Sequence, residues 1–225
     1  MGLVLRRRVV VSAAFAILLA GTCAATLHAL SSKVAWTLDT VRAVRAGDPI
    51  KGKKRNGDCV ACHGENGIAE TPEVPTLAGQ DPLYTYKQLQ DYKSKLRASP
   101  IMGEAVADLT DRDMADLAVF YAGQKPPAGK PAPPAASIAK LVSIGDGTRL
   151  IPACDSCHGA RGAGNRGFYG MPALQNQKRE ELATEMKLFR SGERANDVYR
   201  VMRESAKKLT DAEIDALAAY YGSNK

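Results

Sequence analysis

Histidine is scarce in this chain, and its scarcity limits the chemistry that the chain can support. The 225 residues contain three histidines, His28, His63 and His158, and His28 lies within an N-terminal apolar run. Two histidines therefore remain for chemistry in a folded domain. Two are too few for a zinc site of the three-histidine type. They are also too few for two metal centres that would each take a pair of histidine ligands.

The chain also lacks the patterns of several common function classes. It has no stripe of Lys and Arg interleaved with aromatic residues, and without the four basic residues of 1–35 its net charge falls from +7 to +3. A body so mildly basic does not predict a nucleic-acid partner. There is no Ser/His/Asp arrangement, no phosphate-binding loop and no convergent carboxylate pair. We expect no enzyme of these kinds.

The N-terminal segment is typical of an export signal or a membrane anchor. Arg6–Arg8 precede Val9–Leu30, which is apolar apart from four residues. As a helix this run would span about 33 Å, enough for a bilayer and more than the roughly 7–15 residues usual in a signal peptide. We therefore assign 1–35 as a cleaved signal or a retained anchor. Because positive charge stays inside, 36–225 would lie outside the cytoplasm.

The rest of the chain is an internal duplication. Three sequence marks recur in the same order, 95 to 100 residues later: Cys59–Gly64 as Cys154–Gly159, Val74–Gln80 as Met171–Gln177, and Leu109–Asp111 as Leu209–Asp211. The steady offset predicts two tandem domains, 36–122 and 138–225. The segment between them, 123–137, is rich in proline, which is typical of an extended, semi-rigid linker.

Both repeats are predicted to be helical, so the fold class is all-α. The last helix of each repeat is expected to start after Thr110 or Thr210, because each threonine can cap a helix and Glu213 completes a capping box for the second. Apolar residues then recur with helical spacing and define one buried face. Middle helices are expected at Tyr84–Lys95 and Arg179–Ser191. No segment alternates with the period of a strand.

The motif with chemical content is Cys-x-x-Cys-His, which occurs once in each repeat. Its residues are Cys59, Cys62 and His63, and Cys154, Cys157 and His158. This spacing allows two thiols to form thioether bonds with one haem while the adjacent histidine ligates the iron. We therefore expect two covalently bound haem c groups. The alternatives are a thiol redox pair, one zinc site built from all four cysteines, and ordinary disulfides.

A second axial ligand for each iron follows by elimination. No histidine remains, so a methionine thioether is the expected partner. Met102 and Met202 occupy matching positions in the two repeats, with the same offset of 100 as the Leu-Thr-Asp mark. We therefore pair His63 with Met102 and His158 with Met202. The alternative for either methionine is to fill space in the core.

Proline and basic residues also recur near the motifs. Pro75 and Pro172 follow the motif histidines by 12 and 14 residues. A proline carbonyl could accept a hydrogen bond from the second ring nitrogen of the histidine and fix the ring, or the proline could simply form a turn. Four cations could pair with haem propionates or remain solvated: Lys95, Arg97, Arg190 and Arg194.

Together these residues resemble the diheme cytochrome c4 family, in which two class I c-type cytochrome domains stand in tandem. The resemblance rests on both Cys-x-x-Cys-His-Gly motifs, Pro75–Gln80, Tyr86–Leu89, Met102, Leu109–Asp111, Arg190–Gly192, Met202 and Leu209–Asp211. It covers about 43–225. Two places depart from the pattern: Asn176 stands where the first repeat has Gly79, and Lys178–Glu181 replace the more typical Asp81–Tyr84.

The resemblance implies a role in electron transport rather than catalysis. Each haem would have histidine and methionine ligands, and the domains would pack with their haem edges facing. The chain would be a periplasmic carrier. Residues 9–30 would either be removed as a signal or anchor it to the inner membrane. Its donor would be a quinol-oxidising complex or a dehydrogenase, and its acceptor a terminal oxidase. The alternatives are a dedicated electron-accepting subunit of a dehydrogenase and a haem enzyme or sensor with one five-coordinate iron.

Overall fold

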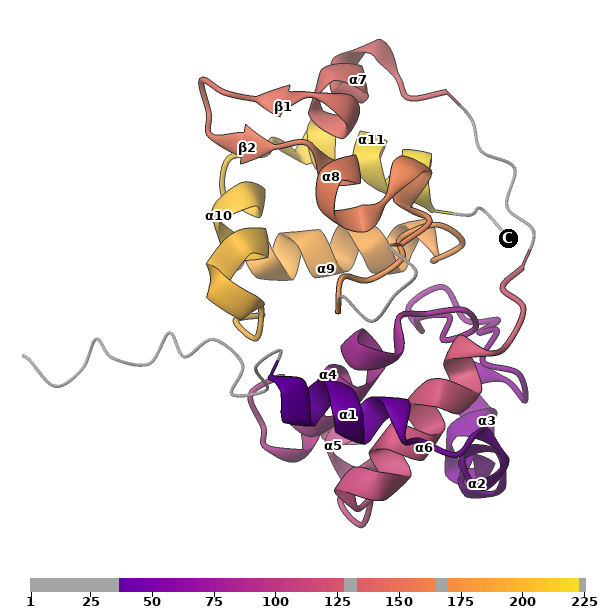
Figure 1. Ribbon diagram of the computed structural model, residues 1–225. Coiled ribbons are helices and arrows are strands. Elements are labelled where there is room, and N and C mark those ends of the chain that lie inside the picture. Colours follow the sequence, from indigo (N-terminus) through magenta and orange to yellow (C-terminus); the bar gives the residue numbers. More distant parts are fainter. Residues whose placement is uncertain (1–36, 128–132, 165–169, 223–225) are drawn as a thin grey trace, which may run out of the picture. The chain divides into compact units, whose positions relative to one another are not determined.

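Helices dominate the computed structural model, which describes residues 37–127, 133–164 and 170–222 (Figure 1). The all-α prediction is therefore confirmed. The apolar N-terminal run and the middle of the Pro-rich linker fall outside these ranges. Within the ranges that are described, no helix is both long enough and apolar enough to cross a membrane.

The first repeat contains six helices among the described residues. In chain order they are α1 Leu38–Arg45, α2 Pro49–Arg55, α3 Gly57–His63, α4 Pro82–Lys93, α5 Pro100–Ala105 and α6 Asp111–Ala122. The middle helix was predicted two residues too late at both ends. Asp81 caps α4 by accepting from the Tyr84 amide, Pro82 follows at its first position, and Lys95 adopts a left-handed conformation with φ 63°. These local features set the true boundaries.

The second repeat has five α-helices among the described residues, and a small hairpin stands between its first two, where the first repeat has α2. Its elements are α7 Ala136–Ser143, β1 Gly145–Asp146, β2 Ile151–Pro152, α8 Cys154–His158, η1 Ala160–Gly162, α9 Arg179–Ser191, η2 Val198–Arg200, α10 Val201–Ala206 and α11 Asp211–Tyr221. The two strands are antiparallel, with Gly145 opposite Pro152. The hairpin was not predicted, because strands of two residues are too short to show an alternating pattern.

Helix α6 organises the core of the first repeat. Its predicted apolar face is buried, with Met114, Leu117, Ala118 and Tyr121 all in one cluster. Helix α2 crosses this helix closely at Gly52, where an added Cβ would lie 2.1 Å from the Asp116 carbonyl oxygen. Burying the face is what stabilises the helix, since side chains of this size each contribute about 1.5–3 kcal/mol when removed from water.

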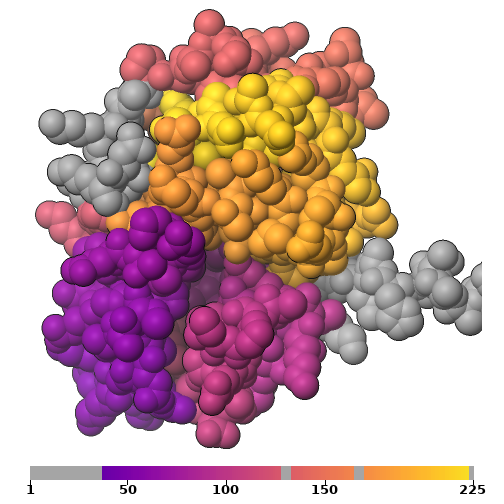
Figure 2. Space-filling view, turned by 180° about the vertical axis from the view of Figure 1, so that it is seen from behind, coloured from indigo at the N-terminus to yellow at the C-terminus, as the bar shows by residue number. Residues whose placement is uncertain are grey.

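Helix α11 organises the core of the second repeat in the same way. Ile214 is fully buried, and Leu217, Ala218 and Tyr221 join a cluster with residues of α7 and α9. Thr210 caps the helix and forms a reciprocal capping box with Glu213, as Thr110 does with Asp113 in the first repeat. In the space-filling view, α9 to α11, orange to yellow, lie next to one another and form a continuous surface on the face shown (Figure 2).

The departure from the family pattern at Asn176 has a local explanation. Gly79 and Asn176 occupy equivalent turns and have nearly the same left-handed backbone, with φ 70° and 69°. Glycine adopts this conformation without cost, and asparagine tolerates it better than most residues do. The turn that precedes Gln80 and Gln177 is therefore conserved in shape although the residue differs.

Candidate haem-binding sites

Helix α3 holds the first Cys-x-x-Cys-His motif. Cys59 and Cys62 are three residues apart, so a helix places them on one face, and His63 is its last residue. The helix ends there because Gly64 adopts φ 75°, and an added Cβ would lie 2.5 Å from the Ile68 carbonyl oxygen. Both thiols are free. The motif is thus presented by one short, sharply ended helix.

Helix α8 repeats this arrangement in the second half of the chain. It runs from Cys154 to His158, and Gly159 ends it with φ 76°. An added Cβ at Gly159 would lie 2.5 Å from the Gly164 carbonyl oxygen. The two motifs therefore have the same local backbone, although they were recognised from sequence letters alone.

Both motif histidines have one ring nitrogen occupied by a carbonyl. Nδ1 of His63 lies 3.0 Å from the Pro75 carbonyl oxygen, and Nδ1 of His158 lies 2.9 Å from that of Pro172. Burial lowers the pKa of both imidazoles, although each carbonyl partly offsets it. The rings are therefore neutral at pH 7. Because a carbonyl can only accept, Nδ1 carries the proton and Nε2 keeps its lone pair for a metal.

The cysteines do not have the properties of a redox-active or zinc-binding set. Burial raises the pKa of the Cys59 thiol, and it raises that of Cys154 to about 11. A reactive dithiol needs a lowered pKa instead. Within 37–127, 133–164 and 170–222, no three His, Cys, Asp or Glu side chains gather as a metal-binding group. The two motifs are thus not joined into one four-cysteine site.

The two candidate methionines lie on short helices late in each repeat. Met102 is in α5, which is capped by Ser99 and begins with Pro100. It is half-buried and packs against the first core cluster, which Cys59 also contacts. Met202 is half-buried in α10. A cysteine pair, a neutral histidine with a free Nε2 and a half-buried thioether in each repeat fit haem c.

The other two methionines on helices of the repeats pack among the apolar side chains of the cores. Met114 is fully buried in the first core, and Met186 packs against the second core cluster. Both therefore fill space between helices, as their helical positions predict. They serve below as controls for the two candidate ligands.

Two of the four basic residues considered for propionates are not solvated surface charges. Arg97 and Arg194 both bond Glu185, at 2.5 Å and 2.6 Å. Arg194 also donates to the Gln88 side-chain oxygen and to the Tyr84 hydroxyl, both in the first repeat. This buried network joins α4 to α9 and the loop after α9. Sequence reasoning missed it because its partners lie about 90 to 110 residues apart.

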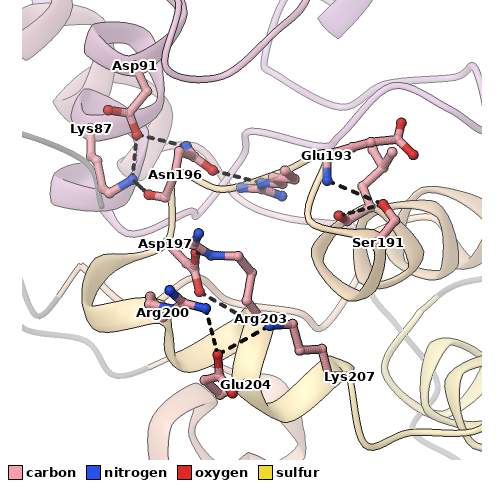
Figure 3. Close-up of polar contacts among 12 residues, drawn as sticks. Lys87, Asp91, Ser191, Glu193, Asn196, Asp197, Arg200, Arg203, Glu204 and Lys207 are labelled. Carbon is pink, nitrogen blue, oxygen red and sulfur yellow. Dashed lines mark hydrogen bonds and ion pairs between the residues drawn. The ribbon is translucent and has the colours of Figure 1, made fainter. Parts of the chain in front are cut away.

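A second buried contact between the repeats lies beside this network. Lys87 donates to Asp91 and to the Asn196 carbonyl oxygen, each at 2.5 Å, and the Asn196 amide donates to Asp91 at 2.7 Å (Figure 3). Asn196 follows α9, whereas Lys87 and Asp91 lie on α4. The ion pair is thus completed by a residue of the other repeat.

Replacing Glu185 with glutamine is expected to lower the free energy of unfolding by about 1.5–3 kcal/mol at pH 7, because two charge-assisted hydrogen bonds are weakened. Burial acts to raise the pKa of Glu185, but Arg194 and Arg97 hold it below its ordinary value. The contribution of the carboxylate is therefore full above the ordinary glutamate pKa of about 4.3 and is lost as pH falls through the folded value. Urea unfolding at pH values from about 3 to about 7, a range that includes the ordinary glutamate pKa, measures both effects.

The matched control is Glu204→Gln. Glu204 also pairs with two cations, Arg200 and Lys207, but about half of its side chain is exposed (Figure 3). Surface pairs of this kind contribute little, so this variant should unfold like the wild type. Equal losses in the two variants, or an unchanged acid dependence in Glu185→Gln, would contradict the role given to Glu185.

Comparison with known proteins agrees with this geometry. The family model described as Cytochrome c matches residues 50–122 and 144–225, so that each match contains one motif. A cytochrome c4 of Thiocapsa roseopersicina is 39% identical over 180 residues, which cover 79% of this chain and 93% of that protein.

A solved structure and a second relative extend the comparison. The crystal structure of reduced recombinant cytochrome c4 from Pseudomonas stutzeri superposes with a TM-score of 0.70 at 34% identity, covering 78% of this chain and 98% of that one. A protein of Stutzerimonas stutzeri strain A1501, named thiosulfate dehydrogenase electron acceptor, is 32% identical over 176 residues, or 73% of this chain and 78% of its own length.

Proposed function

Because the chain belongs to the cytochrome c family and, within it, to the diheme cytochromes c4, we propose that it passes single electrons between respiratory partners in the periplasm, towards a terminal oxidase. It is an electron-transfer protein with two covalently bound haem c groups, and it is not an enzyme. The apolar run at 9–30 supports export, by a cleaved signal or by an anchor.

We propose the ligands of each haem from the motif spacing, the histidines bonded to proline carbonyls and the matching positions of the two methionines. Cys59 and Cys62 would form the thioether bonds that hold the first haem, and His63 and Met102 would supply the ligands of its iron. When bound, haem c supplies a one-electron couple between ferric and ferrous iron.

The equivalent set in the second repeat is Cys154 and Cys157 with His158 and Met202. In each repeat the proline carbonyl, from Pro75 or Pro172, would hold the histidine ring and increase its basicity. Two strong axial ligands would leave no open coordination position for a substrate, which is what a carrier requires.

The observation that carries this proposal is the pairing of each buried motif histidine with a proline carbonyl. It occurs in both repeats, at 3.0 Å and 2.9 Å, and it leaves Nε2 as the ligating atom in each. A redox dithiol or a disulfide would need no such histidine.

The second candidate function is that of an electron acceptor dedicated to one dehydrogenase. The 32% identity to a thiosulfate dehydrogenase electron acceptor favours it. The same haem sites would serve, so the two candidates differ only in the partner that supplies the electrons.

Kinetic measurements with the haem-loaded protein separate the candidates. A respiratory carrier should be oxidised by membranes that contain a haem-copper oxidase, with cyanide sensitivity and turnover that depends on its concentration. A dedicated acceptor should instead be reduced rapidly by thiosulfate dehydrogenase and thiosulfate, and only slowly by a quinol-oxidising complex. Failure to exchange electrons with either set of partners would contradict both proposals.

A further inference from the structure

Two glutamines at equivalent positions connect the repeats reciprocally. The Gln177 side-chain oxygen accepts from the Thr76 amide at 2.9 Å, and its side-chain nitrogen donates to the Thr76 carbonyl oxygen at 2.8 Å. The Gln80 side chain makes the same pair of hydrogen bonds with Ala173, at 2.7 Å and 3.0 Å. Each glutamine therefore holds one residue of the opposite repeat by both of its backbone groups.

The residues that are held lie directly beside the motif histidines. Thr76 follows Pro75, so the Thr76 N–H and the Pro75 carbonyl belong to one planar peptide group. One end of this group accepts from His63, and the other end donates to Gln177. A continuous chain of two hydrogen bonds thus runs from the side chain of one repeat to the histidine of the other.

The second repeat has the mirror arrangement. The peptide group between Pro172 and Ala173 accepts from His158 and donates to Gln80. Gln80 and Gln177 are both buried, with 6% of their surface exposed, so water does not replace these contacts. In such an environment hydrogen bonds in a chain polarise and strengthen one another.

We propose that Gln80 and Gln177 are positioning residues that act across the two repeats, each tuning the reduction potential of the haem in the opposite repeat. The inference rests on the proposed function, because it requires His63 and His158 to ligate iron. An amide N–H that is bonded to glutamine makes the proline carbonyl a better acceptor. A better acceptor draws the histidine proton, makes the ring a stronger donor to iron and favours the ferric state.

The test is a redox titration of full-length, haem-loaded Gln177→Ala and Gln80→Ala, followed by NMR so that the haems are resolved. Signals are assigned with Met102→His and Met202→His, each of which alters one haem. In Gln177→Ala the first-repeat haem should rise in potential, by a shift several-fold larger than that of the second-repeat haem. In Gln80→Ala the second-repeat haem should shift instead.

Two further variants separate tuning from simple loss of packing. Gln177→Met keeps the side-chain volume but removes both hydrogen bonds, and should give the same crossed shift. Gln90→Ala removes an amide that bonds Tyr86 and Asp111 of its own repeat, and should shift neither haem.

The pattern of shifts decides the proposal. Equal shifts of both haems, a shift confined to the repeat that carries the substitution, or no shift at all would overturn it. A missing iron ligand, which would contradict the haem sites of the proposed function, is recognised separately, because the same samples would then bind carbon monoxide when reduced. Potentials can be read whether or not any partner protein accepts the electrons.

Discussion

In Met202→Ala, one of the two haems is expected to lose its thioether ligand while the other keeps its own. The weak long-wavelength band of ferric iron with a methionine ligand should fall to about half its wild-type intensity, since two sites contribute to it. The potential of the second-repeat haem should fall by on the order of 0.1 V, given that axial ligands set haem potentials over about 0.8 V. Visible spectroscopy and a redox titration measure both. Met102→Ala should do the same to the first-repeat haem.

Three control variants separate ligation from packing. Met202→His should also abolish half of the band and lower the potential, but it should keep the iron six-coordinate. Met186→Leu and Met114→Leu change methionines that pack in the cores and should leave the band unchanged. An undiminished band in Met202→Ala, or a band reduced by Met186→Leu, would show that the second iron has a different ligand.

Asp91→Leu is expected to lower the free energy of unfolding by about 3–5 kcal/mol. Asp91 and Lys87 are 0% and 3% exposed, so the substitution leaves a buried ammonium with the Asn196 carbonyl as its remaining hydrogen-bond acceptor. Burial already lowers the pKa of Lys87, against the opposing effect of Asp91. Denaturant unfolding of the haem-loaded protein, followed by absorbance and circular dichroism, measures the loss.

The double variant Lys87→Met with Asp91→Leu tests the physical cause. It removes both charges, so more than half of the lost stability should return, because apolar pairs of similar volume often replace buried ion pairs at little cost. Asn196 also donates to the Gln88 side-chain oxygen at 3.0 Å, and neither variant removes this acceptor. A double variant as unstable as Asp91→Leu alone would mean that the cost arises from packing and not from the uncompensated charge.

Features determined by neighbouring residues could be predicted from the sequence. Thr110 and Thr210 fix the starts of α6 and α11 because a cap needs only the next three residues. The helix Arg179–Ser191 was predicted with its observed bounds, since its apolar period is strong. The tandem order of the two repeats follows from the repeated sequence marks.

Features that depend on the opposite repeat could not be predicted in this way. Arg97 and Arg194 were expected to pair with haem propionates or to remain solvated, because nothing near them in sequence indicates that Glu185 is their partner. Gln80 and Gln177 were seen only as part of a repeated mark. The available signal was that both glutamines, and both arginines, recur with an offset of 97 residues. Symmetry between repeats can thus indicate contacts across their interface.

We propose that both haem irons have two protein ligands each, and the binding of carbon monoxide tests this most directly. The measurement is the visible spectrum of the reduced, haem-loaded wild-type protein before and after the gas is added. No change in the spectrum is predicted, because His63 with Met102 and His158 with Met202 would occupy both axial positions of each iron. A spectral shift in either haem would contradict this, and would indicate an iron that can bind an external ligand, as in a haem enzyme or sensor.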